Sequence, residues 1–229
     1  MRRKLLVSLI GLVVAFACVG ATLVIRGPRI LVSSVSYIHE QNFETTGAPS
    51  LWSASGTVDW DYTTTVLQGS ESMFVDTSAT KEYAILTLAA AYNEIWGYFL
   101  LRMPVVEGLS RDFVYLKATA STQGGIRRNS DGTVRVANGA GVATTVATLD
   151  VSTTYHVWFY FNETTNTSNV AFSTDGTRPT SGDNFAETTS GNANTDVDVF
   201  EFGGVTSTST HSFIFDRVLF DDEQIGNSP

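Results

Sequence analysis

The chain holds few cysteines, histidines and lysines: one, three and three among its 229 residues. The single cysteine, Cys18, lies in an apolar leader, so the rest of the chain forms no internal disulfide. After the leader there is no thiol nucleophile and no Gly-Xaa-Ser-Xaa-Gly sequence, which argues against cysteine hydrolases and α/β-type serine hydrolases. His39, His156 and His211 are widely separated and lack the spacing of zinc ligands. We therefore expect packing to hold the fold, with at most a bound ion to help.

Positive charge is also scarce. The chain has 14 basic against 23 acidic residues, a formal charge of −9. Arg2, Arg3 and Lys4 precede the first apolar run, so 11 basic against 23 acidic residues remain after them, a formal charge of −12. Such a surface repels phosphate backbones and anionic membranes. We expect no nucleic-acid partner.

An apolar leader follows these three basic residues. Residues 5–25 carry no charge, and as a helix their 21 residues are long enough to cross a membrane core of about 30 Å. This favours a signal anchor with its amino terminus inside. Ala15 and Ala17 instead form the Ala-Phe-Ala pattern of a cleavable signal peptide. Either interpretation makes residues 1–29 a leader and predicts that residues 30–229 are exported to the cell surface or the extracellular space, membrane-anchored if the helix is retained.

Short extended runs separated by turn residues fill residues 30–229. Val, Thr, Phe, Tyr and Trp dominate these runs, as is typical of strands. Asp131-Gly132 predicts a tight hairpin, and aromatic residues on both faces of 155–161 predict a strand in the middle of a layered sheet. The one helix-like piece is 88–94. The predicted strands are 36–44, 72–76, 83–89, 96–103, 113–121, 125–128, 133–137, 154–162, 169–173, 197–202 and 212–220.

The order of several short segments carries a resemblance to a known family. These segments are Asn42-Phe43-Glu44, residues 49–52, Gly69-Ser70-Glu71-Ser72-Met73, the Asp131-Gly132 hairpin, the strand 155–161 with the arm 170–176, and Phe215-Asp216-Arg217-Val218. They resemble the concanavalin A-like (laminin G-like) jelly-roll superfamily of lectins and glucanases. The resemblance implies an all-β fold: a two-layer antiparallel jelly-roll β-sandwich, here preceded by one N-terminal apolar helix. Members often bind carbohydrate on the concave sheet or its rim loops, although fold alone does not fix function.

A sugar site on a sandwich needs flat apolar rings and polar groups for the hydroxyls. Residues 59–62 alternate acid with aromatic, so an extended segment displays acids on one side and rings on the other. The alternative is that these rings fill the edge or core of the sandwich. The candidate carbohydrate-binding residues are Asp59, Trp60, Asp61, Tyr62 and Trp96.

One acidic stretch resembles a catalytic signature. Asp196, Asp198 and Glu201 resemble the Glu-x-Asp-x-x-Glu pattern of family 16 glycoside hydrolases, and a bulge near residues 199–200 would bring all three to one face. Retaining hydrolysis requires two carboxyl groups about 5 Å apart. Asp196 stands where that family has a longer Glu nucleophile. We therefore interpret the stretch as the solvated face of a strand and expect no enzyme, with a glycoside hydrolase as the alternative.

The resemblance also implies a structural calcium ion. Such folds often hold one with carboxylates and carbonyls, and their first and last strands are commonly neighbours. Glu44 and Asp216 are the candidate ligands; Asp221, Asp222 and Glu223 are exposed alternatives.

Three functions follow. The first is an exported, lectin-like domain that binds carbohydrate or surface proteins without catalysis, tethered to the membrane through the N-terminal helix if that is retained. The second is a structural or adhesive surface subunit, with a homo-oligomer left open. The third is the glycoside hydrolase. Asn162 and Asn166 begin acceptor triplets for N-glycosylation.

Overall fold

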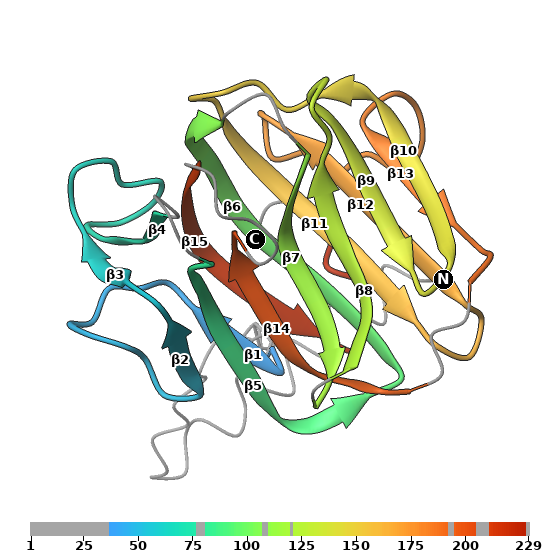
Figure 1. Ribbon diagram of the computed structural model, residues 1–229, viewed down its shortest axis with the longest axis horizontal. Coiled ribbons are helices and arrows are strands. Elements are labelled where there is room, and N and C mark those ends of the chain that lie inside the picture. Colours follow the sequence, from blue (N-terminus) through green and yellow to red (C-terminus); the bar gives the residue numbers. More distant parts are fainter. Residues whose placement is uncertain are drawn as a thin grey trace, which may run out of the picture. The chain divides into compact units, whose positions relative to one another are not determined.

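Fifteen β-strands form the regular structure of the described residues, which are 37–76, 81–106, 110–119, 121–191, 195–204 and 211–227 of a computed structural model. Every strand pair is antiparallel, and the strands build two sheets that pack face to face (Figure 1). The all-β antiparallel sandwich expected from the sequence is therefore confirmed. The predicted apolar helix and leader, residues 1–29, lie outside the described residues. Within the described ranges, no helix is long and apolar enough to cross a membrane.

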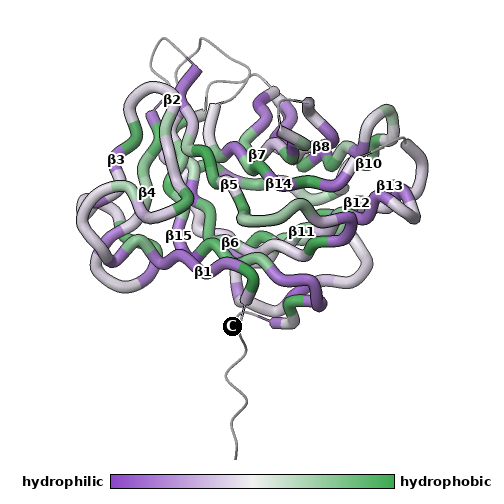
Figure 2. Tube along the Cα trace, turned by 90° about the horizontal axis from the view of Figure 1, so that it is seen from below, coloured by the Kyte–Doolittle hydropathy of each residue, from purple (hydrophilic) through white to green (hydrophobic). Residues whose placement is uncertain are grey.

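Each sheet has a continuous strand order. Sheet A runs β13 (Phe185–Thr188), β12 (Thr167–Ser173), β11 (Thr154–Asn162), β6 (Glu94–Val106), β15 (His211–Asp221), β4 (Ser72–Asp76) and β3 (Val58–Tyr62), and β1 (His39–Gln41) also pairs with β15. Sheet B runs β10 (Gly141–Thr148), β9 (Thr133–Asn138), β8 (Ser121–Arg128), β7 (Arg111–Ala118), β14 (Val197–Gly203), β5 (Tyr83–Tyr92) and β2 (Trp52–Ser55). Figure 2 shows the two layers one above the other.

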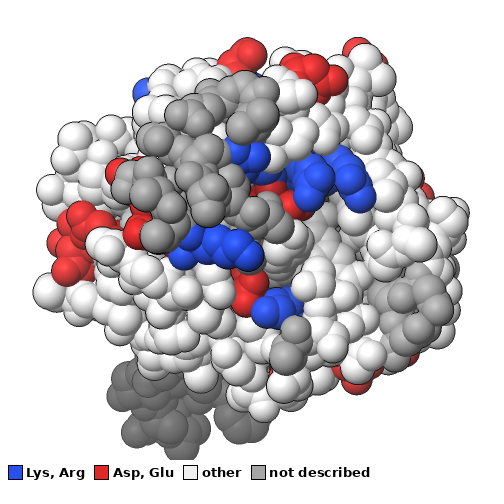
Figure 3. Space-filling view, in the orientation of Figure 1, with Lys and Arg blue, Asp and Glu red and all other residues white. Residues whose placement is uncertain are grey.

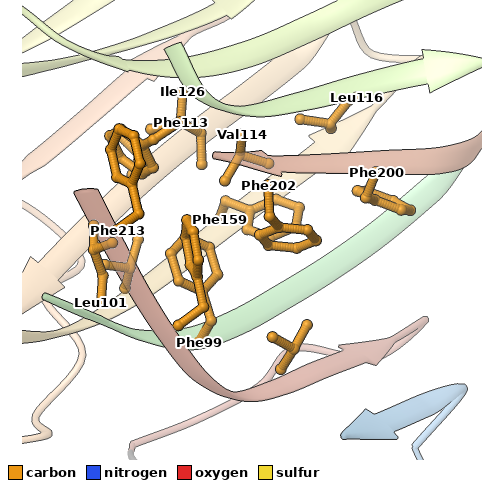
Figure 4. Packing of buried hydrophobic residues seen from close by; sticks show 14 of the residues in the cluster. Phe99, Leu101, Phe113, Val114, Leu116, Ile126, Phe159, Phe200, Phe202 and Phe213 are labelled. Atoms are coloured by element: carbon orange, nitrogen blue, oxygen red, sulfur yellow. The ribbon is translucent and has the colours of Figure 1, made fainter. Parts of the chain in front are cut away.

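Aromatic side chains from both sheets meet between the layers. Phe99 of β6 contacts Phe202 of β14 edge to face, with ring centroids 5.7 Å apart. Phe159 of β11 lies 6.1 Å from Phe200 of β14. All four side chains are at most 1% exposed, and Figure 4 shows them in the core. Because buried aromatic area is a large stabilising contribution, this packing takes the place of disulfides.

Strand β11 is buried on both faces, as its aromatic pattern predicted. It lies between β6 and β12 in sheet A. Phe159 points into the inter-sheet core, whereas the fully buried Trp158 packs on the other face with Tyr98 of β6, at a ring distance of 5.4 Å. Leu100, Ala171, Leu219 and Ile225 are the other buried members of this second apolar cluster. Sheet A therefore carries apolar packing on its outer face as well as its inner one.

The helix-like interpretation of 88–94 is wrong. These residues form the end of β5, a turn at Asn93 and the start of β6. Along β5, Leu86 and Leu88 are buried while Thr87 between them is exposed, which is the period of a strand. Pairing with β14 and β2 overrides the helix preference of the alanines.

The predicted hairpin at Asp131-Gly132 is confirmed and joins β8 to β9. Gly132 has a φ of +90°, which glycine adopts without the steric cost of a side chain. The Asn129 N–H donates to the Thr133 carbonyl at 2.8 Å and closes the loop. The hairpin fixes the register of the two strands that carry the site described next.

Candidate functional site

The outer face of sheet B carries a pocket of about 160 Å³ over strands β7, β8 and β9. Along β7, Val114 and Leu116 point into the core, so Tyr115 between them points outward. Tyr115, Gln123 and Arg135 line the pocket from three neighbouring strands. In the view of Figure 1 this face points toward the reader, and Figure 3 shows Lys and Arg side chains gathered over its middle.

Two glycines of β8 form the floor of this pocket. Gly125 lies opposite Tyr115 in the β7–β8 register. A Cβ on Gly125 would lie 2.8 Å from the Tyr115 ring and 2.9 Å from the Val114 carbonyl, and one on Gly124 would lie 2.5 Å from the Ala137 carbonyl. These distances are too short for real contacts. Gly125 is therefore what lets the Tyr115 ring lie close to β8, and Gly124 is what lets β8 approach the Ala137 carbonyl of β9.

A two-pronged ion pair anchors one side of the pocket. Arg127 Nε donates to Asp112 Oδ1 at 2.9 Å, and Arg127 Nη2 donates to Oδ2 at 2.6 Å. The Tyr115 hydroxyl donates to the same carboxylate at 3.0 Å. The hydrogen bonds to Asp112, which is 5% exposed, raise the pKa of Arg127 above its already high value. This network fixes both Arg127 and the Tyr115 ring.

A second ion pair lies beside the first. Lys117 Nζ lies 2.7 Å from Glu201 Oε1, linking β7 to β14, and Glu201 is 5% exposed. Arg135 differs from both of these cations, because it forms no hydrogen bond or ion pair with any other residue that the structure describes. Arg135 is half-buried and lines the pocket. Its guanidinium thus presents unused N–H donors to whatever occupies the pocket.

The structure does not bring the predicted carbohydrate-binding rings together. Trp60 and Tyr62 lie on β3, and Trp96 lies on β6 of the same sheet, three strand positions away, about 14 Å at the usual strand spacing. Trp60 packs on the inter-sheet core, 5.9 Å from Trp52. Tyr62 stacks on Phe74 at 4.4 Å.

Trp96 belongs to the apolar cluster on the outer face of sheet A. Its ring stacks on Tyr160 at 4.1 Å, and the Arg178 guanidinium lies 4.7 Å from its centroid. The two acids of the same prediction accept hydrogen bonds from backbone N–H groups. Asp59 accepts from the Asp61 N–H at 3.1 Å, and Asp61 accepts from the Gly47 N–H at 2.7 Å.

The three acids of the catalytic alternative lie along β14 and just before it. The strand has a register irregularity between Val197 and Val199, whereas residues 199–200, where the bulge was predicted, pair regularly. Asp198 accepts from the Thr119 N–H at 2.8 Å and lines a pocket of about 380 Å³ together with Asp196 and Glu163. A hydrogen bond with Asp196 raises the pKa of Glu163. Glu201, farther along the strand, binds Lys117 instead.

The predicted pair Glu44 and Asp216 does come together, because β1 pairs with β15. Both residues line a pocket of about 260 Å³ with Asn42, Gln68 and Gly69. Asp216 is fully buried, and its Oδ2 accepts from the Gln68 N–H at 2.9 Å. Burial raises the pKa of Asp216 to about 6.

This pocket has the donor chemistry of a calcium site. Carboxylate and amide oxygens are the hard ligands that Ca²⁺ prefers, and no ion pair to Asp216 occurs within the described ranges. Among the described residues, no group of three or more His, Cys, Asp or Glu side chains is placed to hold a metal. Here a cation would therefore also need oxygens from Asn42, from backbone or from water. Ser70 already donates to both Glu44 oxygens, and Gln68, Ser72 and Arg217 donate to those of Asp216, so an ion would bind through the remaining lone pairs.

The sequence analysis missed Tyr115, Gln123 and Arg135. A partial signal was present: Arg127 and Arg135 flank the predicted turn at residues 129–132, and the structure pairs them directly. Like charges in directly opposite positions destabilise a sheet, so they need a partner or a function. The adjacent glycines Gly124 and Gly125, close to Arg127 in the sequence, were a second signal, because glycines within a strand often mark a site of close approach.

The fold is similar to that of several solved structures, whereas no family model and no curated protein matches the sequence. "Cellulose induced protein, Cip1" superposes with a TM-score of 0.60 over 82% of this chain and 99% of its own, at 16% identity. Trypanosoma rangeli sialidase in complex with the inhibitor DANA gives a TM-score of 0.57 over 82% of this chain and 30% of its own, at 12% identity. The binding domain of botulinum neurotoxin DC in complex with SialylT gives a TM-score of 0.52 over 76% of this chain and 43% of its own, at 12% identity. This chain thus spans under a third of the sialidase, and the likeness shows the fold alone.

Proposed function

We propose that this chain is a carbohydrate-binding domain of the concanavalin A-like type that holds a glycan over strands β7, β8 and β9. The observation that carries the proposal is the pocket itself, in which the Tyr115 ring, seated on Gly125, lies beside the polar groups of Gln123 and Arg135. A sugar requires this combination, an aromatic face for its CH groups and donors and acceptors for its hydroxyls.

The similar structures support a carbohydrate partner. Two of them, the neurotoxin binding domain and the sialidase, were solved with SialylT and with DANA. Residues 1–29 support a place outside the cell for the domain, tethered to the membrane if the apolar run is retained. A surface protein is the alternative partner, and the chain would then be a structural or adhesive subunit.

We propose binding without cleavage. Glycoside hydrolysis uses one protonated carboxyl group and one free carboxylate. At this face Asp112 accepts three hydrogen bonds from Arg127 and Tyr115, and Glu201 accepts one from Lys117. Both carboxylates are thus already engaged by a cationic side chain. Both carboxylates are therefore better suited to positioning cations than to proton transfer.

A structural Ca²⁺ held by Glu44 and Asp216 is the second part of the proposal. The ion would neutralise the buried Asp216 carboxylate and tie β15 to the segments that carry Glu44 and Gln68. It lies in a different pocket from the glycan, so its role is stability.

A glycan array probed with the full chain in detergent tests the binding proposal. We expect saturable binding to a defined group of glycans, and we expect Tyr115→Ala to abolish it because the ring is lost. Tyr62→Ala, which removes a ring stacked on Phe74 in sheet A, is the matched control and should bind normally. Absence of saturable binding to any glycan, or equal binding by Tyr115→Ala that retains the native circular dichroism spectrum, would contradict the proposal.

A further inference from the structure

We propose that the glycan bound over β7, β8 and β9 is acidic, and that Arg135 binds a carboxylate on its sugar ring. This inference rests on the proposed glycan-binding function and names the class of ligand. It starts from the pairing of Arg127 with Arg135 across the β8–β9 hairpin.

Two guanidinium groups in directly opposite positions repel each other, because their Cβ atoms lie only about 5 Å apart. Asp112 neutralises Arg127 through two hydrogen bonds. No other described residue neutralises Arg135. The pair therefore retains one positive charge that no side chain in the described part of the chain compensates.

The second ion pair of this face leaves that imbalance in place. Lys117 and Glu201 cancel each other in their ion pair. The pocket and its border thus hold three cations, Lys117, Arg127 and Arg135, against two carboxylates, in a chain whose formal charge is −9. Basic residues are thus concentrated at this pocket, although the sequence as a whole has few of them. An anionic ligand would explain this local concentration of positive charge.

A carboxylate fits the unused guanidinium better than a hydroxyl does. Arg presents N–H donors in a planar fork that matches the two oxygens of a carboxylate, and such charge-assisted hydrogen bonds are about twice as strong as neutral ones. The partly buried position of Arg135 strengthens the interaction further, since the pocket holds less water than the open surface. Tyr115 and Gln123 line the same pocket, where the Tyr115 ring can contact the CH face of the same sugar ring and Gln123 its hydroxyls.

The net negative charge of the chain does not prevent this. Exposed charges farther than about 8 Å are largely screened at physiological ionic strength, whereas a direct contact is not. A short acidic oligosaccharide meets the local positive charge at Arg135. A long polyanion with dense phosphates also meets the acidic surface around it.

The experiment compares each acidic saccharide with its own methyl ester. The probes are hexasaccharides of galacturonate and of glucuronate, 3′-sialyllactose, the methyl ester of each, and a sulfated disaccharide, titrated by calorimetry into the full chain in detergent. We expect at least one acid to bind and its ester to bind at least tenfold more weakly. Arg135→Gln should lose the same factor for the acid and leave the affinity for the ester unchanged.

Arg178→Gln is the matched control, because Arg178 lies over Trp96 in the cluster on the outer face of sheet A; it should leave every affinity unchanged. Equal affinity for acid and ester, or binding of neutral glycans alone, would overturn the inference while the proposed function stands. Preference for the sulfated sugar would overturn the carboxylate assignment. Absence of binding to every probe and to every neutral glycan of the array would overturn both.

Discussion

Arg127 and Arg135 lie directly opposite each other in the hairpin of β8 and β9, and among the described residues only Arg127 has an acidic partner. Asp112 supplies that partner from β7, the next strand of sheet B. The arrangement makes Asp112 the residue that lets the two arginines share one face. Asp112 also links stability to the proposed function, because the same carboxylate accepts a hydrogen bond from the Tyr115 hydroxyl.

Asp112→Asn should therefore destabilise the protein. The change removes the charged acceptor of Arg127 and leaves two guanidinium groups opposed. Hydrogen bonds to charged groups contribute about 1.5–3 kcal/mol, and we expect a loss of that size in urea unfolding at pH 7. Adding Arg135→Gln to this variant should recover part of the loss, since the repulsion disappears. An unchanged midpoint in Asp112→Asn would contradict this account of the pair.

The sequence predicted the central strands of the fold well and the edge strands poorly. Residues 155–161 and 212–220 are apolar at most positions, and they form most of β11 and β15 in the middle of sheet A. The strands absent from the predicted set, β2, β3, β10 and β13, all lie at the ends of the two sheets. An edge strand is covered less, so it needs fewer apolar residues and leaves a weaker pattern in the sequence.

Sequence motifs alone could not predict the candidate site, because it forms where strand pairing brings residues from separate segments together. Trp60 and Trp96 are prominent in the sequence, but they occupy β3 and β6, separated by two strands of sheet A. Arg135 becomes prominent only when the hairpin register places it opposite Arg127. Glu44 and Asp216 were predicted to meet because first and last strands are commonly neighbours, and β1 does pair with β15.

Gly125→Ala should impair binding more than folding. The new Cβ would lie 2.8 Å from the Tyr115 ring and 2.9 Å from the Val114 carbonyl, so the ring and the strand must shift. We expect a loss of about 1–3 kcal/mol in unfolding free energy, as for other overpacked positions, and at least a tenfold loss of glycan affinity. Gly226→Ala is the control, because nothing lies within 4 Å of a Cβ there. A glycan affinity of Gly125→Ala equal to that of the unsubstituted protein would show that binding does not depend on the position of the Tyr115 ring.

Calcium should stabilise the protein through Asp216. At pH 7 the fully buried carboxylate, whose pKa burial raises to about 6, is mostly charged and carries a desolvation cost that a cation offsets. We expect 5 mM CaCl₂ to raise the melting temperature relative to EGTA, and the increase to disappear in Asp216→Asn. It should also shrink below about pH 6, where protons compete for the carboxylate. Asp222→Asn, an exposed acid of the same region, is the control. Equal melting temperatures in calcium and EGTA would contradict the proposed ion.

His39 should make the fold sensitive to acid. Burial lowers the pKa of His39 to about 4, and its neutral Nε2 accepts the Trp52 indole N–H at 3.1 Å. In the unfolded chain the same imidazole takes up a proton near its ordinary pKa of about 6.5. The unfolded state thus binds more protons between these two values, so the free energy of unfolding should fall as the pH drops from about 6.5 to about 4. His39→Gln, whose amide oxygen can accept the same N–H, should flatten this part of the profile measured by urea unfolding in EGTA. His211, which burial also shifts to a pKa of about 4, adds a similar slope that this variant leaves in place. An identical slope in His39→Gln would show that the buried imidazole is not the acid-sensitive group.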